Sequence, residues 1–61
     1  MVNLDDLMDV MWNHPAVKVK LYGEIEPCTY EYIGDIEEEY WSYTVASVQV
    51  YEHSIDIELA E

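Results

Sequence analysis

The residues of this 61-residue chain that could perform chemistry are one cysteine and two histidines, set among fourteen aspartates and glutamates. Nucleophilic catalysis would need Cys28 or a serine beside His14 or His53, with a carboxylate to orient the imidazole. Carboxylates are so frequent here that one near either histidine carries no information. Cys28 lies at a predicted strand start, where a small buried thiol usually has a packing role. We therefore expect a protein that is not an enzyme.

The densest group of possible metal ligands is the triplet Glu37, Glu38 and Glu39. Consecutive side chains point in different directions, so the triplet does not build a cage around an ion. The sequence contains no EF-hand loop and no Cys/His pair at zinc spacing. We expect neither a metal site nor a cofactor.

The formal net charge of -12 is the strongest unusual feature of the chain. Because a phosphate backbone is held by Lys and Arg, two lysines and no arginine argue against direct nucleic-acid binding and against an anionic membrane surface. Solubility alone is served by a net charge of magnitude about 2–8, and a larger one costs stability through self-repulsion. A merely solvated surface remains the alternative. We expect an acidic face that binds a basic protein surface.

Aromatic residues follow the glutamate triplet directly, and aromatic anchors beside a charged rim are typical of protein interfaces. The same aromatics could instead form cross-strand pairs or a homodimer seam. On the last predicted strand, two carboxylates share one face at a spacing of about 6.7 Å. The predicted binding residues are Glu37, Glu38, Glu39, Tyr40, Trp41, Tyr43, Asp56 and Glu58.

Hydrophobic periodicity predicts the elements that position these residues. Apolar residues at helical spacing predict an amphipathic helix over residues 4–13, with the stripe Leu4, Leu7, Met8 and Met11. Asn3 occupies the N-cap position, and acidic residues in the first turn complement the helix dipole. Pro15 ends the helix, because the backbone of His14 before it is displaced from the helical region.

After Pro15 the apolar period changes to two, which predicts strands at 17–22, 28–33, 46–51 and 55–59. A hairpin turn at 52–54 makes the last two strands antiparallel neighbours. The segment 36–41 fits either a helical turn capped by Asp35 or a charged loop. The strands should add to the core Val17, Val19, Leu21, Ala46, Val48, Val50, Ile55, Ile57 and Leu59. The fold class is therefore α+β: one domain, 1–61, with an N-terminal amphipathic helix on a small antiparallel sheet of three or four strands.

Size and cysteine content bear on oligomeric state and location. A core of this size contributes only about 3–5 kcal/mol, and one cysteine cannot form an internal disulfide, so we expect a homodimer or a chain that matures against a partner. The start does not resemble a signal peptide, and no apolar run approaches the roughly 18 residues that cross a bilayer. These features predict a cytoplasmic location without membrane binding.

Three segments carry a resemblance to known proteins: the capped start Met-Val-Asn-Leu-Asp-Asp-Leu-Met, the strand Val-Lys-Val-Lys-Leu-Tyr-Gly, and the ending Ser-Ile-Asp-Ile-Glu-Leu. In these and in overall organisation the chain resembles the very small acidic proteins that phages encode against host defence, such as anti-CRISPR proteins. The resemblance implies a viral inhibitor, commonly dimeric, that mimics nucleic acid and binds a nuclease, helicase or effector complex. These inhibitors share no residue signature, so no functional residue is transferred.

Two other functions stay open at this point. An oligomer could act as a sponge for a small signalling molecule, with Lys18 and Lys20 of each copy holding its phosphates. The chain could also be an acidic antitoxin-like or structural accessory protein.

Overall fold

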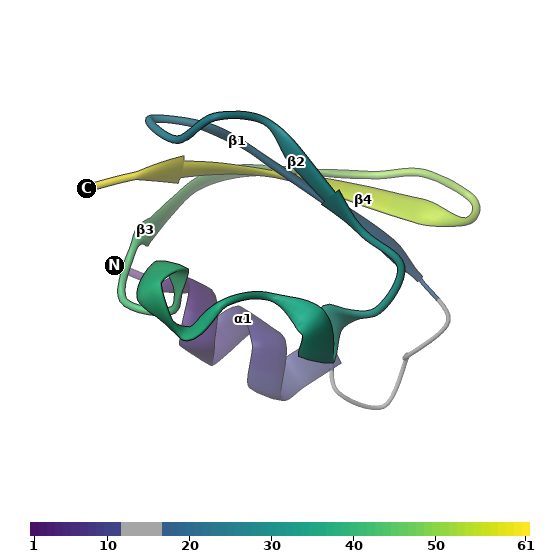
Figure 1. Ribbon diagram of the computed structural model, residues 1–61, viewed down its shortest axis with the longest axis horizontal. Coiled ribbons are helices and arrows are strands. Elements are labelled where there is room, and N and C mark those ends of the chain that lie inside the picture. Colours follow the sequence, from purple (N-terminus) through teal and green to yellow (C-terminus); the bar gives the residue numbers. More distant parts are fainter. Residues whose placement is uncertain (12–16) are drawn as a thin grey trace.

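An N-terminal helix packs against one face of a four-stranded sheet in the computed structural model, which describes residues 1–11 and 17–61 (Figure 1). The regular elements are α1 (Leu4–Met11), β1 (Lys18–Gly23), β2 (Cys28–Tyr30), β3 (Thr44–Val50) and β4 (Ser54–Ala60). Two short 3-10 helices, η1 (Ile33–Asp35) and η2 (Glu38–Tyr40), lie in the connection between β2 and β3. The predicted α+β fold class is confirmed.

The strand order is β2-β1-β4-β3, and the sheet is mixed. The outer pairs, β1 with β2 and β3 with β4, are antiparallel as predicted. The central pair is parallel, with Lys18 opposite Ser54 and Gly23 opposite Leu59. A hairpin turn sets the relative direction of only the two strands that it joins. β1 and β4 are not joined in this way, because β2, β3 and their connection lie between them in the chain. The sequence therefore did not reveal this parallel pair.

The start of α1 is capped by side-chain and backbone groups. The side-chain oxygen of Asn3 accepts the backbone N–H of Asp6 at 3.1 Å, which confirms the predicted N-cap. The predicted continuation of the helix to 12–13 and the roles of His14 and Pro15 lie outside the described residues.

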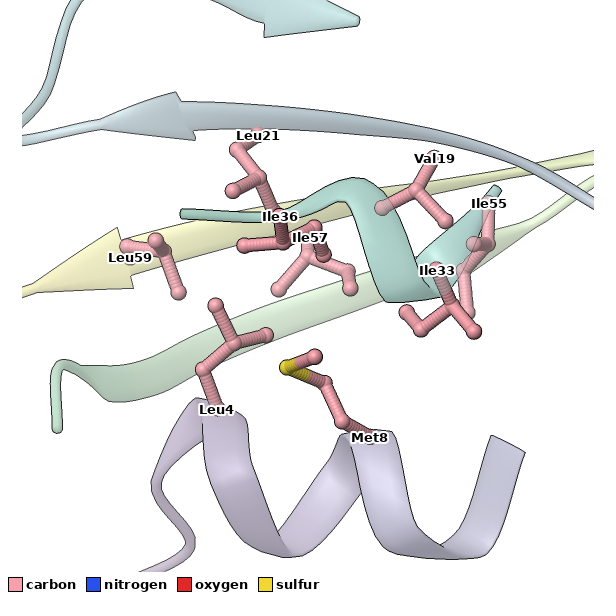
Figure 2. Packing of buried hydrophobic residues seen from close by; sticks show 9 residues of the cluster. All are labelled: Leu4, Met8, Val19, Leu21, Ile33, Ile36, Ile55, Ile57 and Leu59. Carbon is pink, nitrogen blue, oxygen red and sulfur yellow. The ribbon is translucent and has the colours of Figure 1, made fainter. Parts of the chain in front are cut away.

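The core lies between the sheet and the layer formed by α1 and the β2–β3 connection (Figure 2). Its buried side chains are Leu4, Met8, Val19, Leu21, Ile33, Ile36, Ile55, Ile57 and Leu59. The contributions of α1, β1 and β4 were predicted, and Val17 is half-buried beside them. The sequence had not assigned Ile33 and Ile36 to the core, yet they pack beside α1 and close the layer over the sheet (Figure 2).

The prediction that Ala46, Val48 and Val50 are core residues is wrong. A β-bulge between Val45 and Ser47 leaves Ala46 as an extra residue, so the alternation restarts after it. Val45 is the residue that packs against the core. Val48 and Val50 stand opposite Ile57 and Ile55, yet they are 39% and 77% exposed because β3 is the edge strand.

The connections differ from prediction in two details. Strand β2 ends at Tyr30, three residues before the predicted end, since the chain turns into η1 to bury Ile33. Segment 36–41 does contain a helical turn, but Asp35 ends η1, and Glu37 at the N-cap of η2 makes no side-chain cap. The predicted hairpin is confirmed by the Tyr51 N–H, which donates to the Ser54 oxygen at 2.8 Å.

Candidate protein-binding surface

Acidic side chains gather on the side of the sheet that α1 covers. We call α1 together with residues 32–43 the helical layer, since both lie on this side (Figure 1). The layer contains no lysine or arginine. Its exposed carboxylates, half of the fourteen in the chain, are Asp5, Asp6, Asp9, Asp35, Glu37, Glu38 and Glu39.

The glutamate triplet is presented on a turn that is fixed at both ends. Before it, Ile33 and Ile36 are 2% and 3% exposed and hold the chain against the core. Within it, the backbone oxygens of Glu37 and Glu38 accept the N–H groups of Tyr40 and Trp41, each at 3.1 Å. All three glutamate side chains are exposed, so a rigid turn holds their charges in water.

The predicted aromatic anchors support this turn. The rings of Tyr40 and Tyr43 meet edge to face with centroids 5.7 Å apart. Trp41 is half-buried, and its indole N–H donates to the backbone oxygen of Ile36 at 3.0 Å. All three aromatics pack against the core. Their first role in the structure is therefore to hold the helical layer together, and only part of each ring is open to a partner.

The same turn is joined to the start of α1 through the backbone. Tyr43 and Trp41 accept the N–H groups of Leu4 and Asp5 on their main-chain oxygens, at 2.8 Å and 2.9 Å. These N–H groups have no partner inside the helix, so the bonds satisfy them. The acidic first turn of α1 and the glutamate triplet consequently belong to one rigid unit.

A chain of side-chain hydrogen bonds links β2 to the triplet. The Cys28 thiol donates to the Tyr30 hydroxyl at 3.3 Å, and the Tyr30 hydroxyl donates to the Glu37 carboxylate. Burial, together with the bonds to Cys28 and Glu37, raises the pKa of Tyr30. The bond from Tyr30 lowers the pKa of Glu37, so this carboxylate stays ionised. Burial and the charge of Glu39 likewise raise the pKa of Tyr40.

Asp56 and Glu58 lie on the opposite face of the sheet. Because Ile55, Ile57 and Leu59 of β4 face the core, the residues between them point to the outer face. The structure therefore does not bring these two predicted site residues together with the glutamate triplet.

Both lysines occupy that same outer face. Lys20 stands opposite Asp56 in the parallel pair, and Lys18 lies 3.9 Å from a carboxylate oxygen of Glu31. Glu58 accepts a hydrogen bond from the Ser47 hydroxyl at 2.9 Å. The outer face is thus mixed in charge, in contrast to the helical layer.

The predicted binding residues leave out the carboxylates of α1. Asp5, Asp6 and Asp9 were expected to complement the helix dipole and to belong to the acidic surface, but not to the binding site, and all three are exposed beside the apolar stripe. The helical period already places them on the outward side of Leu4 and Met8, and that signal would have identified them.

The described residues, 1–11 and 17–61, contain no group of three or more His, Cys, Asp or Glu side chains that could hold a metal ion. In the same residues, no helix has the length and apolar character needed to span a bilayer. No protein-family model matches the chain. No curated protein and no solved structure matches it either.

Proposed function

We propose that this chain is a phage-type inhibitor of a bacterial defence system, which binds a basic surface of a defence protein and performs no chemistry of its own. The observation that supports this function is a helical layer whose charged side chains are all negative. Seven carboxylates and no lysine or arginine lie in the helical layer, whereas Lys18 and Lys20 lie on the opposite face. The proposed contact surface is therefore the helical layer, without Asp56 and Glu58.

A surface of this kind suits a groove that normally holds nucleic acid. Such grooves carry Lys and Arg to neutralise phosphates, and a rigid array of carboxylates presents a similar field to them. Complementary fields accelerate association and disfavour acidic bystanders. The partner we propose is a nuclease, helicase or effector subunit in the host cytoplasm, bound at its nucleic-acid-binding or catalytic surface.

Apolar contact area is available within the same layer. Val10 is 74% exposed on α1, and Tyr32 is 56% exposed at the start of the connection. Tyr40 and Tyr43 are half-buried, so part of each ring is accessible. Aromatic side chains beside charges supply the desolvated contacts that most binding energy comes from.

The test is a pull-down of the tagged chain from bacterial lysate at about 50 mM and about 500 mM NaCl, with mass spectrometry of the eluate. We expect a basic defence protein that is retained at low salt and released at high salt. The double variant Glu38→Gln/Glu39→Gln should retain less of it. The control Glu26→Gln/Glu52→Gln removes the same charge from exposed sites outside the helical layer and should retain as much as the wild type. Equal loss in both variants, or retention independent of salt, contradicts the proposal.

The sponge hypothesis gains no support from the surroundings of the lysines. Lys18 lies near Glu31, and Lys20 stands opposite Asp56, so a phosphate would meet carboxylates beside each ammonium group. Equilibrium dialysis against nucleotides distinguishes the two functions, because a sponge depletes them and a groove-binding inhibitor does not.

A further inference from the structure

Strand β3 has an open edge along most of its length. The sheet order places β3 outermost, and the N-terminal residues cover only its beginning. There, Asn3 pairs with Thr44, and the Val45 N–H donates to the Val2 oxygen at 2.9 Å. From Ala46 onward, no strand among the described residues pairs with this edge.

The backbone groups that face this edge belong to Val48 and Val50. The Tyr51 N–H donates to the backbone oxygen of Ser54 across the hairpin, so the backbone groups of Tyr51 face β4. Along an antiparallel strand, the backbone N–H and C=O groups of successive residues face the paired strand and the free edge in turn. Those of Val50 and Val48 therefore face the free edge and are called outward here. The bulge at Ala46 shifts the register by one residue, so the backbone groups of Val45 also face away from β4. The bond from the Val45 N–H to the Val2 oxygen agrees with this direction. Each of the two outward valines therefore presents an N–H and a C=O to the open edge.

Beyond the β-bulge at Ala46, the edge lacks the features that usually prevent strand pairing. Protected edges carry bulges, lysine, proline or charges that point toward the core. Apart from the bulge, residues 44–51 include none of these, although 26% of the chain is charged. Val50 is 77% exposed and Tyr51 is 53% exposed. The opposite edge, β2, is only three residues long and is protected by its shortness.

We propose that the β3 edges of two copies pair antiparallel about a two-fold axis at Gln49, so that the chain forms a homodimer with one continuous sheet. In this register Val48 stands opposite the partner's Val50, and Gln49 stands opposite the partner's Gln49. The outward valines form the hydrogen-bonded pairs, and each pair exchanges two N–H···O bonds.

A second copy fits this edge because the strand is complementary to itself. On the core side the valines meet each other, and on the outer face Gln49 meets the second Gln49 and Ser47 meets Tyr51. The contact is isologous and closes on itself, which leaves only the short β2 edges at the ends of the joined sheet. The two-fold axis stands perpendicular to the sheet, so both helical layers lie on the same side.

The charge of the chain sets the salt dependence of this dimer. The seam itself carries no charged residue, but each copy brings a formal charge of -12. Repulsion between the copies is screened over about 8 Å at physiological ionic strength. The dimer should therefore tighten as salt rises, whereas binding of a basic partner should weaken. The dimer does not depend on the proposed function, and these opposite responses separate a failure of one from a failure of the other.

The experiment is sedimentation equilibrium of the full chain at about 50 mM and about 500 mM NaCl. We expect a monomer–dimer equilibrium whose dissociation constant falls at the higher salt. Val50→Lys should raise that constant by at least about tenfold, since it places two lysines at the seam. Val10→Lys is the matched control, because Val10 is 74% exposed on α1 and the charge change is the same. It should dimerise as the wild type does.

A monomer at about 1 mM protein and high salt overturns the proposal, as does a Val50→Lys variant that dimerises like the control. Circular dichroism checks that each variant is folded. Amide hydrogen exchange of the wild type gives a second measurement that needs no substitution. Protection of the Val48 and Val50 amides should rise with protein concentration, and protection that is independent of concentration contradicts the seam.

Discussion

The indole N–H of Trp41 donates a hydrogen bond to the backbone oxygen of Ile36, 3.0 Å away. This bond ties the end of the acidic turn to its beginning, because Ile36 is buried before the glutamate triplet and Trp41 follows it. The main-chain oxygen of Trp41 also accepts the N–H of Asp5. One residue thus holds both ends of the triplet and the first turn of α1.

Replacing the indole donor should destabilise the fold measurably. Trp41→Phe keeps an aromatic ring in place but leaves the Ile36 oxygen without its partner. We expect a loss of about 1 kcal/mol in the free energy of unfolding, measured by urea denaturation. The exposed Tyr32→Phe is a control for the loss of a polar aromatic group and should change this free energy by less than about 0.5 kcal/mol. If both substitutions lower the free energy of unfolding equally, the hydrogen bond from Trp41 to Ile36 does not stabilise the fold.

Gly23 should not tolerate a side chain. Its φ is +105°, and a Cβ atom there would overlap the backbone oxygen of Leu59 on the neighbouring strand. The same oxygen accepts the Glu24 N–H at 3.0 Å, so it cannot move without losing that bond. Gly23→Ala should cost about 1–3 kcal/mol, seen as a lower urea midpoint. Gly34 has no positive φ, and Gly34→Ala should leave the midpoint unchanged or raise it.

The bond between Tyr30 and Glu37 should appear in the pH dependence of stability. The lowered pKa of Glu37 stabilises the fold above its ordinary value of about 4.3, and this contribution is lost as the pH falls through the lowered pKa. The raised pKa of Tyr30 stabilises the fold below about pH 10, and this contribution is lost as the pH rises further. The stability difference between wild type and Tyr30→Phe should therefore be largest between these limits.

Urea midpoints of the two proteins from about pH 3 to about pH 11 measure this difference. Tyr32→Phe serves again as the control, because Tyr32 is exposed. A difference for Tyr30→Phe that stays constant over the whole range contradicts the coupling.

The sequence predicted those elements whose hydrophobic pattern is uninterrupted. The helical stripe with Leu4 and Met8 and the alternation around Val19 and Ile57 placed α1, β1 and β4 correctly, because each pattern buries one face. On β3 the same reasoning failed for two reasons. The one-residue bulge puts Val45 in the core in place of Ala46, and the edge position leaves Val48 and Val50 exposed although they stand opposite Ile57 and Ile55.

The candidate site was only partly predictable for a related reason. Periodicity says which residues of one element share a face, but it does not say which elements share a side of the molecule. Asp56 and Glu37 are both surface carboxylates, and only the packing of β4 against the core beneath the helical layer places them on opposite sides of the sheet. The joining of Tyr43 to Leu4 through their backbone groups leaves no trace in side-chain patterns.

Glu38 and Glu39 should reduce stability in the free protein, as expected of residues kept for binding, whereas Glu37 accepts the Tyr30 hydroxyl. The side chains of Glu38 and Glu39 are exposed and no lysine or arginine lies in the helical layer, so their main electrostatic partners are other carboxylates. Glu38→Gln/Glu39→Gln should therefore raise the melting temperature by about 2–4 °C at low salt, and less at high salt, where the repulsion is screened. Glu58→Gln gives the contrast.

Glu58 lies on the outer face, where its side chain accepts the Ser47 hydroxyl. Its neutralisation should leave the melting temperature unchanged or lower it, because it weakens a charge-assisted hydrogen bond. Differential scanning calorimetry of the three proteins at both salt concentrations measures these shifts. If the two variants raise the melting temperature equally, the carboxylates act only through net charge. Repulsion between carboxylates is then no stronger in the helical layer than on the outer face. If only the triplet variant gains stability, and it also retains less of the basic partner, then the same charges that oppose folding are those that support binding.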